Sequence, residues 1–236
     1  MARESYRVQG IVIRTYDFGE ADRIIVLLTK NHGLVRGVAK GVRRAKSRFG
    51  SRLQPFVELD LTLYKGRNLE SITSADTLKF LATGIIEHPE RYFAASAILE
   101  ATERLASSDI YPLTIWALEE MRSAENPTLM LDIFLLHAMN IAGWAPSLYH
   151  CASCQTPGPH HAFHPAPGGA VCVHCRVPGT IEVDEETLHI MWQLTHKQPV
   201  VAISTQHARN IHRLTEAHFH WHTERTLASL KVLDQA

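Results

Sequence analysis

The chain has 236 residues and no net formal charge, because 24 Lys or Arg balance 24 Asp or Glu, and 45% of its residues are hydrophobic. That length allows roughly one or two domains with an ordinary core, and no apolar run approaches the roughly 18 residues of a membrane span. The first residues also lack the apolar core of a secretory signal peptide. We therefore expect a cytoplasmic protein without a membrane partner.

Strand patterns fill the first 76 residues. They lie at residues 8–15, 23–29, 34–39, 57–64 and 69–74. In the fourth, apolar residues from Val57 to Leu63 alternate with polar ones, which predicts one buried and one solvated face. Five short strands predict a small closed barrel. An OB-fold fits this pattern, and an SH3-like barrel fits the strand count almost as well. The long connection between the third and fourth strands favours the OB-fold.

A cationic segment occupies that long connection. Residues 40–52 contain six basic residues, no acidic residue and one aromatic residue, Phe49. The basic residues are Lys40, Arg43, Arg44, Lys46, Arg48 and Arg52. Charge is also uneven along the chain, since residues 1–80 hold 15 Lys or Arg against 8 Asp or Glu, and residues 81–236 hold 9 against 16. We expect the segment to bind a phosphate backbone. Phe49 and Tyr64 are candidates for base stacking, although Phe49 is equally suited to anchor the loop to the barrel.

From residue 77 the hydrophobic period becomes that of helices. We expect helices at residues 89–106, 112–122, 128–142, 185–196 and 208–232. The third is apolar nearly all round, which is typical of a helix buried in a bundle. In the last, Leu227 and Leu230 are candidate core positions. Two helical blocks therefore flank a Pro-, Gly- and His-rich insertion at about residues 147–181.

All four cysteines lie in that insertion, as two Cys-x2-Cys pairs separated by 17 residues: Cys151, Cys154, Cys172 and Cys175. This is the spacing of a tetrahedral zinc site. Two disulfides are an alternative that a cytoplasmic location disfavours, and a redox Cys-x-x-Cys is disfavoured because there are two matched pairs and no adjoining βαβ pattern. We expect a structural Zn²⁺ held by four thiolates. Five nearby histidines are expected not to be ligands: His150, His160, His161, His164 and His174.

No sequence motif of an enzyme stands out. The chain has no P-loop and no Ser-His-Asp or Cys-His nucleophile signature. The acidic run from Asp184 to Glu186 stands where a helix is predicted to start, so a favourable interaction with the helix dipole explains it. We therefore expect a protein without catalytic residues.

Short motifs spread over nearly the whole chain carry a resemblance to a known family. They are Gly10-Ile11-Val12-Ile13, Gly19-Glu20-Ala21-Asp22-Arg23-Ile24, Leu28-Thr29, His32-Gly33, Ala39-Lys40-Gly41-Val42-Arg43-Arg44, Leu53-Gln54-Pro55-Phe56, Tyr64-Lys65-Gly66, Pro89-Glu90-Arg91-Tyr92 and Leu227-Ala228-Ser229-Leu230-Lys231-Val232-Leu233. In order and spacing, together with the four-cysteine segment, they resemble RecO, the bacterial recombination mediator.

The resemblance implies an N-terminal OB-fold, a helical C-terminal domain and a zinc module. It also implies binding to single- and double-stranded DNA and annealing of complementary strands. The implied partners are RecR, in some cases RecF, and RecA, which is loaded onto DNA coated by single-strand-binding protein. A contact between the helical domain and the acidic C-terminal tail of that protein is implied as well.

The overall expectation is an α+β chain with two domains. Residues 1–78 form a five-stranded OB-fold barrel, and residues 79–236 form an all-α helical domain that carries the inserted zinc module. The expected function is a DNA-binding and strand-annealing mediator in DNA repair, located in the cytoplasm at the nucleoid. The alternatives are an OB-fold that binds RNA and a protein adaptor whose basic loop grips an acidic partner.

Overall fold

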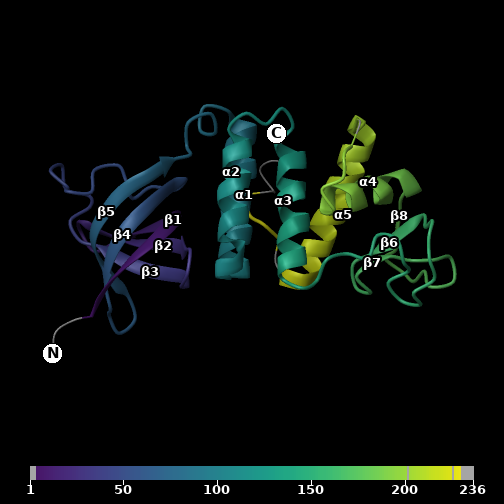
Figure 1. The fold of residues 1–236 in the computed structure, drawn as a ribbon, viewed down its shortest axis with the longest axis horizontal. Coiled ribbons are helices and arrows are strands. Elements are labelled where there is room, and N and C mark those ends of the chain that lie inside the picture. Colours follow the sequence, from purple (N-terminus) through teal and green to yellow (C-terminus); the bar gives the residue numbers. More distant parts are fainter. Residues whose placement is uncertain (1–3, 201, 225, 230–236) are drawn as a thin grey trace. The chain divides into compact units, whose positions relative to one another are not determined.

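The N-terminal strands form a closed five-stranded barrel. The computed structural model describes residues 4–200, 202–224 and 226–229. The strands are β1 (Ser5–Phe18), β2 (Asp22–Thr29), β3 (Gly33–Ala39), β4 (Val57–Tyr64) and β5 (Glu70–Phe80) (Figure 1). Their order is β1-β2-β3-β5-β4, and β1 also pairs with β4, so the barrel closes. Only β3 and β5 pair in parallel. This order is that of an OB-fold, which confirms the prediction and excludes the SH3-like alternative.

Two local features let the barrel close. The pairing register of β1 shifts between Val12 and Arg14, and such a bulge bends a strand. The bend lets this 14-residue strand pair with β4 through its first half and with β2 through its second half. Gly37 on β3 faces Ile72 on β5, where an added Cβ would lie only 2.8 Å from Ile72 Cγ1. The close parallel pair therefore requires glycine at this position.

Both faces of the barrel sheet contribute to the core. The inward-facing side chains of all five strands, among them Val12, Leu27 and Leu59, form one buried cluster. On the opposite face, Ile11 and Val26 are buried as well. They are buried because helical segments of the same unit cover part of the barrel, with α1 (Pro89–Leu105) contacting β1 and the 3-10 helix η1 (Ser108–Ile110) contacting β3.

The chain divides into two compact units, residues 1–125 and 126–236, and the first unit continues beyond the barrel. It includes α1, η1 and α2 (Tyr111–Met121). Arg14 on β1 pairs with Glu103 on α1, with 3.3 Å between Nε and Oε2. The buried hydroxyls of Thr102 and Thr114, 3.0 Å apart, join α1 to α2. The boundary expected at residue 78 lies near the end of β5, and the compact unit extends past it.

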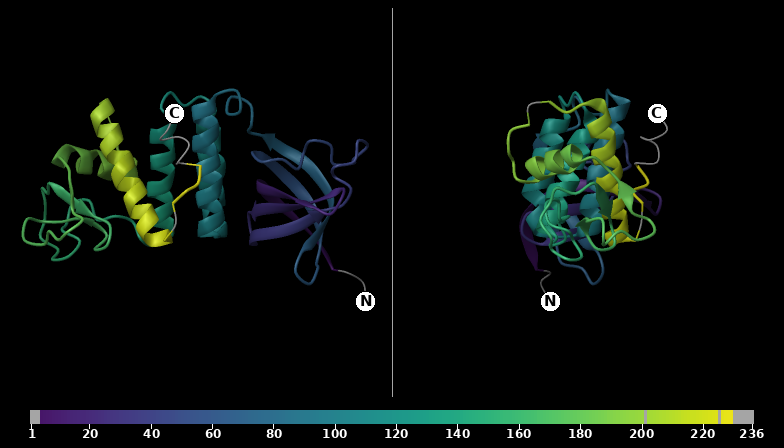
Figure 2. Two further views of the ribbon diagram at one scale, coloured as in Figure 1. Left: turned by 180° about the vertical axis from the view of Figure 1, so that it is seen from behind. Right: turned by 90° about the vertical axis from the view of Figure 1, so that its right-hand side faces the viewer.

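The second unit combines helices with the cysteine segment. It contains α3 (Pro127–Ile141), the short strands β6 (Ala162–His164), β7 (Gly169–Ala170) and β8 (Ile181–Glu182), α4 (Glu185–Thr195) and α5 (Thr205–Thr223). The side chains of Asn126, Asp184 and Ser204 cap the N-termini of α3, α4 and α5. α5 packs against α3 (Figure 2). The expected α+β combination of a barrel followed by helices is therefore confirmed.

Two elements end at positions that differ from the sequence-based expectation. β5 continues to Phe80 because residues 75–80 still pair with β4, although most are exposed and so show no alternation. α5 ends at Thr223, since Glu224 adopts a left-handed conformation with φ of 55°. The prediction that this helix continues is therefore wrong at Glu224 and at residues 226–229, and residues 225 and 230–232 lie outside the described residues. Leu227 is nevertheless buried, and Leu230 lies outside the described residues. None of the described helices is long and apolar enough to cross a membrane.

Candidate nucleic-acid interface and candidate metal centre

The basic loop, defined here as residues 40–56 between β3 and β4, has an apolar side and a cationic side. Val42, Phe49 and Leu53 belong to the buried cluster inside the barrel. Phe49 is only 1% exposed, so it cannot stack on a base, and of its two expected roles the structure supports anchoring. Tyr64, at the end of β4, is half-buried. The loop therefore covers the barrel interior with its apolar residues and turns its charged residues outward.

Consecutive turns hold the backbone of the basic loop. Four N–H groups donate to carbonyls three residues earlier at 3.0–3.2 Å: Arg44 to Gly41, Ser47 to Arg44, Gly50 to Ser47 and Arg52 to Phe49. The loop begins with a tether to the preceding hairpin, because the Gly41 N–H donates to Asp22 Oδ1 at 2.7 Å. Gly41 has a φ of 66°, a conformation that glycine adopts without strain. These bonds set the direction in which the cationic side chains leave the loop.

All six predicted cations are exposed on the basic loop, but their neighbours differ. Arg43 lies 3.4 Å from Asp17. Arg52 donates to the Ala75 carbonyl at 2.7 Å and lies 3.8 Å from Asp76. The Arg48 guanidinium stands 4.8 Å from the centre of the Phe49 ring. No carboxylate in the described part of the chain forms an ion pair with the remaining three, Lys40, Arg44 and Lys46. Those three cations are the ones most available to an external anion.

Arg23 is a further cation beside the basic loop, and sequence reasoning did not include it. It lies on β2, where it pairs in register with Ala39, the residue just before the loop. Its guanidinium contacts Asp17 at 3.0 Å, and Asp17 also contacts Arg43. Arg23 and the loop therefore share one carboxylate. The pairing register that brings them together becomes known only once β2 and β3 are aligned, so no local sequence signal could have identified it.

The four cysteines lie close together in the second unit. Their Sγ atoms are all within 4.8 Å of one another, and among the described residues they form the one cluster of potential metal ligands. All four are free thiols. The Sγ atoms of Cys154 and Cys172 are 3.7 Å apart. In a tetrahedral site with Zn–S bonds of about 2.3 Å, sulfur atoms lie about 3.8 Å apart, whereas a disulfide needs about 2.05 Å. The arrangement therefore fits a tetrahedral metal ion and does not fit two disulfides.

Backbone and side-chain donors make the four thiols unequal in acidity. Burial tends to raise the pKa of Cys151, but the N–H groups of Cys172, Cys154 and Ser153 outweigh it and lower that pKa. A hydrogen bond with Thr156 lowers the pKa of Cys154 to about 6. The neighbouring Cys172 thiol raises the pKa of Cys175 to about 12. Four thiols this close cannot all ionise unless a cation compensates their charge, and a bound divalent metal would do so.

Two of the nearby histidines contact backbone carbonyls. His160 Nε2 lies 3.1 Å from the Thr156 carbonyl, and His164 Nε2 lies 3.2 Å from the Pro178 carbonyl. Cys151 is buried against Ala162 and Val171, so the small β7-β6-β8 sheet supports the first cysteine pair. The structure thus brings together the four predicted cysteines and leaves the histidines out of the cluster.

Comparison with known families covers both parts of the chain. The family described as Recombination protein O N terminal matches residues 1–81, and the family described as Recombination protein O C terminal matches residues 87–231. The first match contains the barrel and the basic loop, and the second contains the four cysteines. The resemblance drawn from short motifs is confirmed, and with it a role in DNA repair and recombination. The chain therefore belongs to the RecO family.

Proposed function

We propose that this protein binds DNA and anneals complementary strands as a recombination mediator. One observation supports this most directly: a closed OB-fold barrel presents six exposed cations on a loop whose apolar side chains are buried inside the barrel. The anchored loop holds the cations in a defined arrangement, so less conformational entropy is lost when they meet phosphates. No catalytic step is part of this proposal.

The cations act on the phosphate backbone and not on base edges. Lys40, Arg44 and Lys46 have no competing ion pair among the described residues, and Arg43, Arg48 and Arg52 extend the positive surface. Long cationic side chains neutralise phosphates without reading sequence. Two complementary strands repel each other through their phosphates. A surface that screens both strands and leaves the bases free allows them to pair.

The partners in this proposal follow from family membership. The protein would act with RecR, and with RecF, to help load RecA onto single-stranded DNA coated by single-strand-binding protein. The barrel domain, residues 1–78, would handle DNA, and the helical domain, residues 79–236, would meet the acidic C-terminal tail of single-strand-binding protein. The net negative charge of residues 81–236 supports the first assignment, because it repels the phosphate backbone from the helical domain. The contact with the acidic tail rests on family membership alone. Such work would take place in the cytoplasm, at the nucleoid.

Zn²⁺ is the proposed metal of the cysteine cluster. Four sulfur ligands, two Cys-x2-Cys pairs and a tetrahedral spacing are the properties of structural zinc sites. Such a site has no open coordination position, so the ion would stabilise the segment and would not activate water. Cys151, Cys154, Cys172 and Cys175 would be its ligands.

Binding to single-stranded DNA at several salt concentrations tests the central proposal. If four to six phosphates are neutralised, the logarithm of the binding constant should fall against the logarithm of salt concentration with a slope of about −3 to −4. A slope near zero would rule out the loop as a phosphate-binding surface. Matched DNA and RNA oligomers in competition would separate this proposal from RNA binding.

Strand annealing tests the mediator role itself. Two complementary strands labelled with a donor and an acceptor dye should anneal faster with the protein, with and without single-strand-binding protein. A variant with Arg44→Ala and Lys46→Ala should anneal more slowly. An adaptor protein would instead bind an acidic protein partner and leave the annealing rate of the free strands unchanged.

A further inference from the structure

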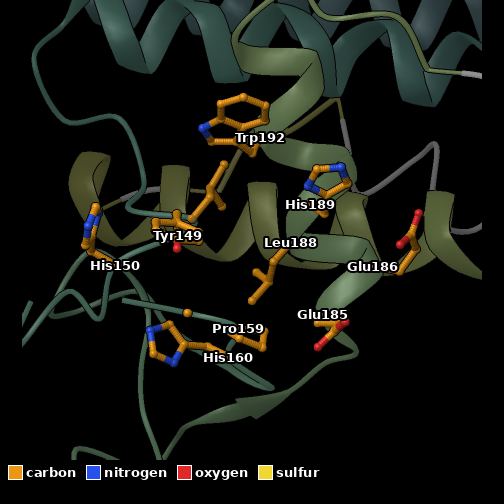
Figure 3. Close-up of a pocket in the computed structure, with 11 residues that line it drawn as sticks. Tyr149, His150, Pro159, His160, Glu185, Glu186, Leu188, His189 and Trp192 are labelled. Atoms are coloured by element: carbon orange, nitrogen blue, oxygen red, sulfur yellow. The ribbon is translucent and has the colours of Figure 1, made fainter. Parts of the chain in front are cut away.

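A pocket lies in the second unit between the cysteine segment and α4. Its volume is about 780 Å³, within the range of roughly 300–1,000 Å³ that ligand pockets occupy. Residues between Leu148 and His160 form one wall, and α4 forms the other. Figure 3 shows Leu188 projecting from α4 toward Pro159, with the Trp192 ring at one end of the pocket.

One face of α4 lines the pocket. Glu185, Leu188, His189 and Trp192 follow the i, i+3, i+4, i+7 spacing of a single helical face. Leu188 is 2% exposed, which places an apolar floor between the two walls. The pocket is thus built into the fold of this unit by a regular helix.

The walls of the pocket are largely aromatic and aliphatic. Tyr149 and Trp192 stand on opposite walls, and Leu148 and Pro159 add aliphatic surface. Tyr149 is 55% exposed, so its ring remains open to solvent at the mouth of the pocket. Trp192 is half-buried and its ring stacks on His196, with 4.4 Å between the ring centres, so it contributes apolar surface. Exposed tyrosine is enriched where proteins contact one another, and its ring face attracts cations.

The polar groups of the pocket are acidic or imidazole groups. Glu185 and Glu186 lie in the first turn of α4, and three histidines, His150, His160 and His189, complete the lining. No lysine or arginine is among the described residues that line it. The described lining therefore offers two carboxylates and no ammonium or guanidinium group. A phosphate, a nucleic acid or an acidic peptide would therefore be repelled.

We infer that this pocket binds a Lys or Arg side chain flanked by apolar residues on a short segment of a partner protein. The carboxylates match the cation, the exposed ring of Tyr149 can stack on it, and Leu188 with Pro159 accommodates an apolar neighbour. A wholly apolar ligand would fit poorly, because it would cover the carboxylates without offering them a donor. This site goes beyond the proposed function: it selects a charge opposite to that selected by the basic loop.

A peptide array probes this site with the full-length, metal-loaded protein. Each peptide carries one Lys or Arg between two apolar residues, with every apolar combination represented. The array also carries matched control peptides in which the cationic residue is replaced by Gln or by Glu. We expect the protein to bind peptides of the cationic series and not to bind the matched Gln and Glu peptides. Absence of any binder in the cationic series, or preference for the Glu series, would overturn the inference.

Charge reversal in the pocket then tests whether the strongest peptide binds there. Glu186→Lys should weaken its binding by about fivefold or more, as loss of charge complementarity does. Glu90→Lys is the matched control, since Glu90 is an exposed residue in the first turn of α1 and lies outside the pocket. Both substitutions disturb a helix N-terminus to a similar degree. Equal binding by Glu186→Lys and the unaltered protein would contradict the assignment.

The aromatic wall is tested with a second pair of variants. Tyr149→Ala should weaken the same peptide by about two- to fivefold, the range of an exposed cation–aromatic contact. Tyr149→Phe, which keeps the ring, should bind like the unaltered protein, and weakening by both variants would count against the ring contact. None of these substitutions should change the salt dependence of DNA binding. A failure of the pocket is therefore distinguishable from a failure of the DNA-binding proposal.

Discussion

The Tyr111 hydroxyl donates a hydrogen bond to the Glu58 carboxylate across 2.5 Å, and this bond joins α2 to β4. Both residues are buried, with exposed fractions of 4% and 8%. Burial, together with the hydrogen bond to Glu58 and its charge, raises the pKa of Tyr111 above its ordinary value. The phenol therefore stays protonated, and it connects the barrel to the helices of the first unit.

Tyr111→Phe should lower the free energy of unfolding by about 1–3 kcal/mol, because the buried Glu58 carboxylate loses that donor. Urea unfolding at neutral pH measures the change, and Tyr92→Phe, at a tyrosine that is 42% exposed, is the control. The pKa of Tyr111 is higher in the folded than in the unfolded chain. The protonated phenol therefore contributes fully to the free energy of unfolding below about pH 10, and this contribution is lost as the pH rises further. An unchanged urea midpoint for Tyr111→Phe would contradict this account.

Phe49→Ala should destabilise the barrel by about 3–5 kcal/mol, the usual cost of truncating a buried phenylalanine. Phe49→Leu should cost less, because it keeps an apolar side chain inside the barrel. Since Phe49 is buried, Phe49→Leu should leave affinity for single-stranded DNA within about twofold, below 1 kcal/mol. Thermal unfolding and DNA titration measure the two quantities. A tenfold loss of affinity without loss of stability would instead indicate base stacking by this ring.

The cations of the basic loop should separate into two groups. Arg44→Ala with Lys46→Ala should reduce the steepness of the salt dependence by about 1.4, which corresponds to two phosphate contacts on single strands, without changing stability. Arg52→Ala should also cost about 1 kcal/mol of stability, because Arg52 donates to the Ala75 carbonyl. Lys30→Ala is the control. Lys30 lies in the turn between β2 and β3, and the basic loop begins at the other end of β3. Equal salt slopes for the control and the double variant would remove the loop from the interface.

Elemental analysis of the purified protein should find about one zinc per chain. Cys154→Ser or Cys172→Ser should lose the metal and expose residues 147–181 to proteolysis, because structural zinc contributes roughly 10 kcal/mol or more of apparent binding energy in small modules. DNA affinity should fall much less than stability. Ser153→Ala, in the same knuckle, should retain the metal. A metal-free wild-type protein that resists proteolysis equally well would contradict the zinc assignment.

Acid should destabilise the second unit through His218. This residue is 1% exposed, its Nε2 donates to the Trp144 carbonyl at 2.9 Å, and its Nδ1 has no hydrogen-bond partner among the described residues. Burial lowers the pKa of His218 to about 4, with a smaller contribution from His222. The unfolded chain therefore binds the proton first as the pH falls below about 6.5. The free energy of unfolding is therefore unaffected by His218 above that pH, and it decreases as the pH falls toward 4.

At pH 5 the protonation of His218 in the unfolded chain should lower the free energy of unfolding by about 2 kcal/mol relative to neutral pH. His218→Gln keeps a side-chain N–H for the Trp144 carbonyl and cannot titrate, so its stability should depend less on pH between 7 and 5. His220→Gln, at an exposed neighbouring position, should behave like the wild type. Urea unfolding at the two pH values, with metal content followed in parallel, measures the difference. Parallel pH profiles for wild type and His218→Gln would exclude His218 as the cause.

Local patterns in the sequence account for most of the elements. The alternation from Val57 to Leu63 marked β4, and Asn126 followed by Pro127 marked the start of α3. The sequence-based prediction failed where an element's end depends on contacts between distant residues or carries no typical terminating residue. Residues 75–80 belong to β5 because they pair with β4. α5 ends at Thr223, and neither glycine nor proline follows there to indicate the end of a helix.

The sequence by itself determined the chemistry of both candidate sites. Six cations within thirteen residues repel one another wherever the loop lies, and two Cys-x2-Cys pairs position their sulfurs within each pair through local backbone geometry. The sequence also determined the succession of strands and helices, because period and turn residues are local properties.

Only the tertiary structure decided which of these residues are available. Strand pairing closed the barrel and brought Arg23 beside the basic loop. Packing placed the side chain of Phe49, a residue of that loop, inside the barrel. It also gave Arg43 and Arg52 partners while Lys40, Arg44 and Lys46 have no ion pair among the described residues. The pocket between α4 and the cysteine segment likewise depends on how distant segments pack. Such contacts join residues far apart in the chain, so no local pattern records them.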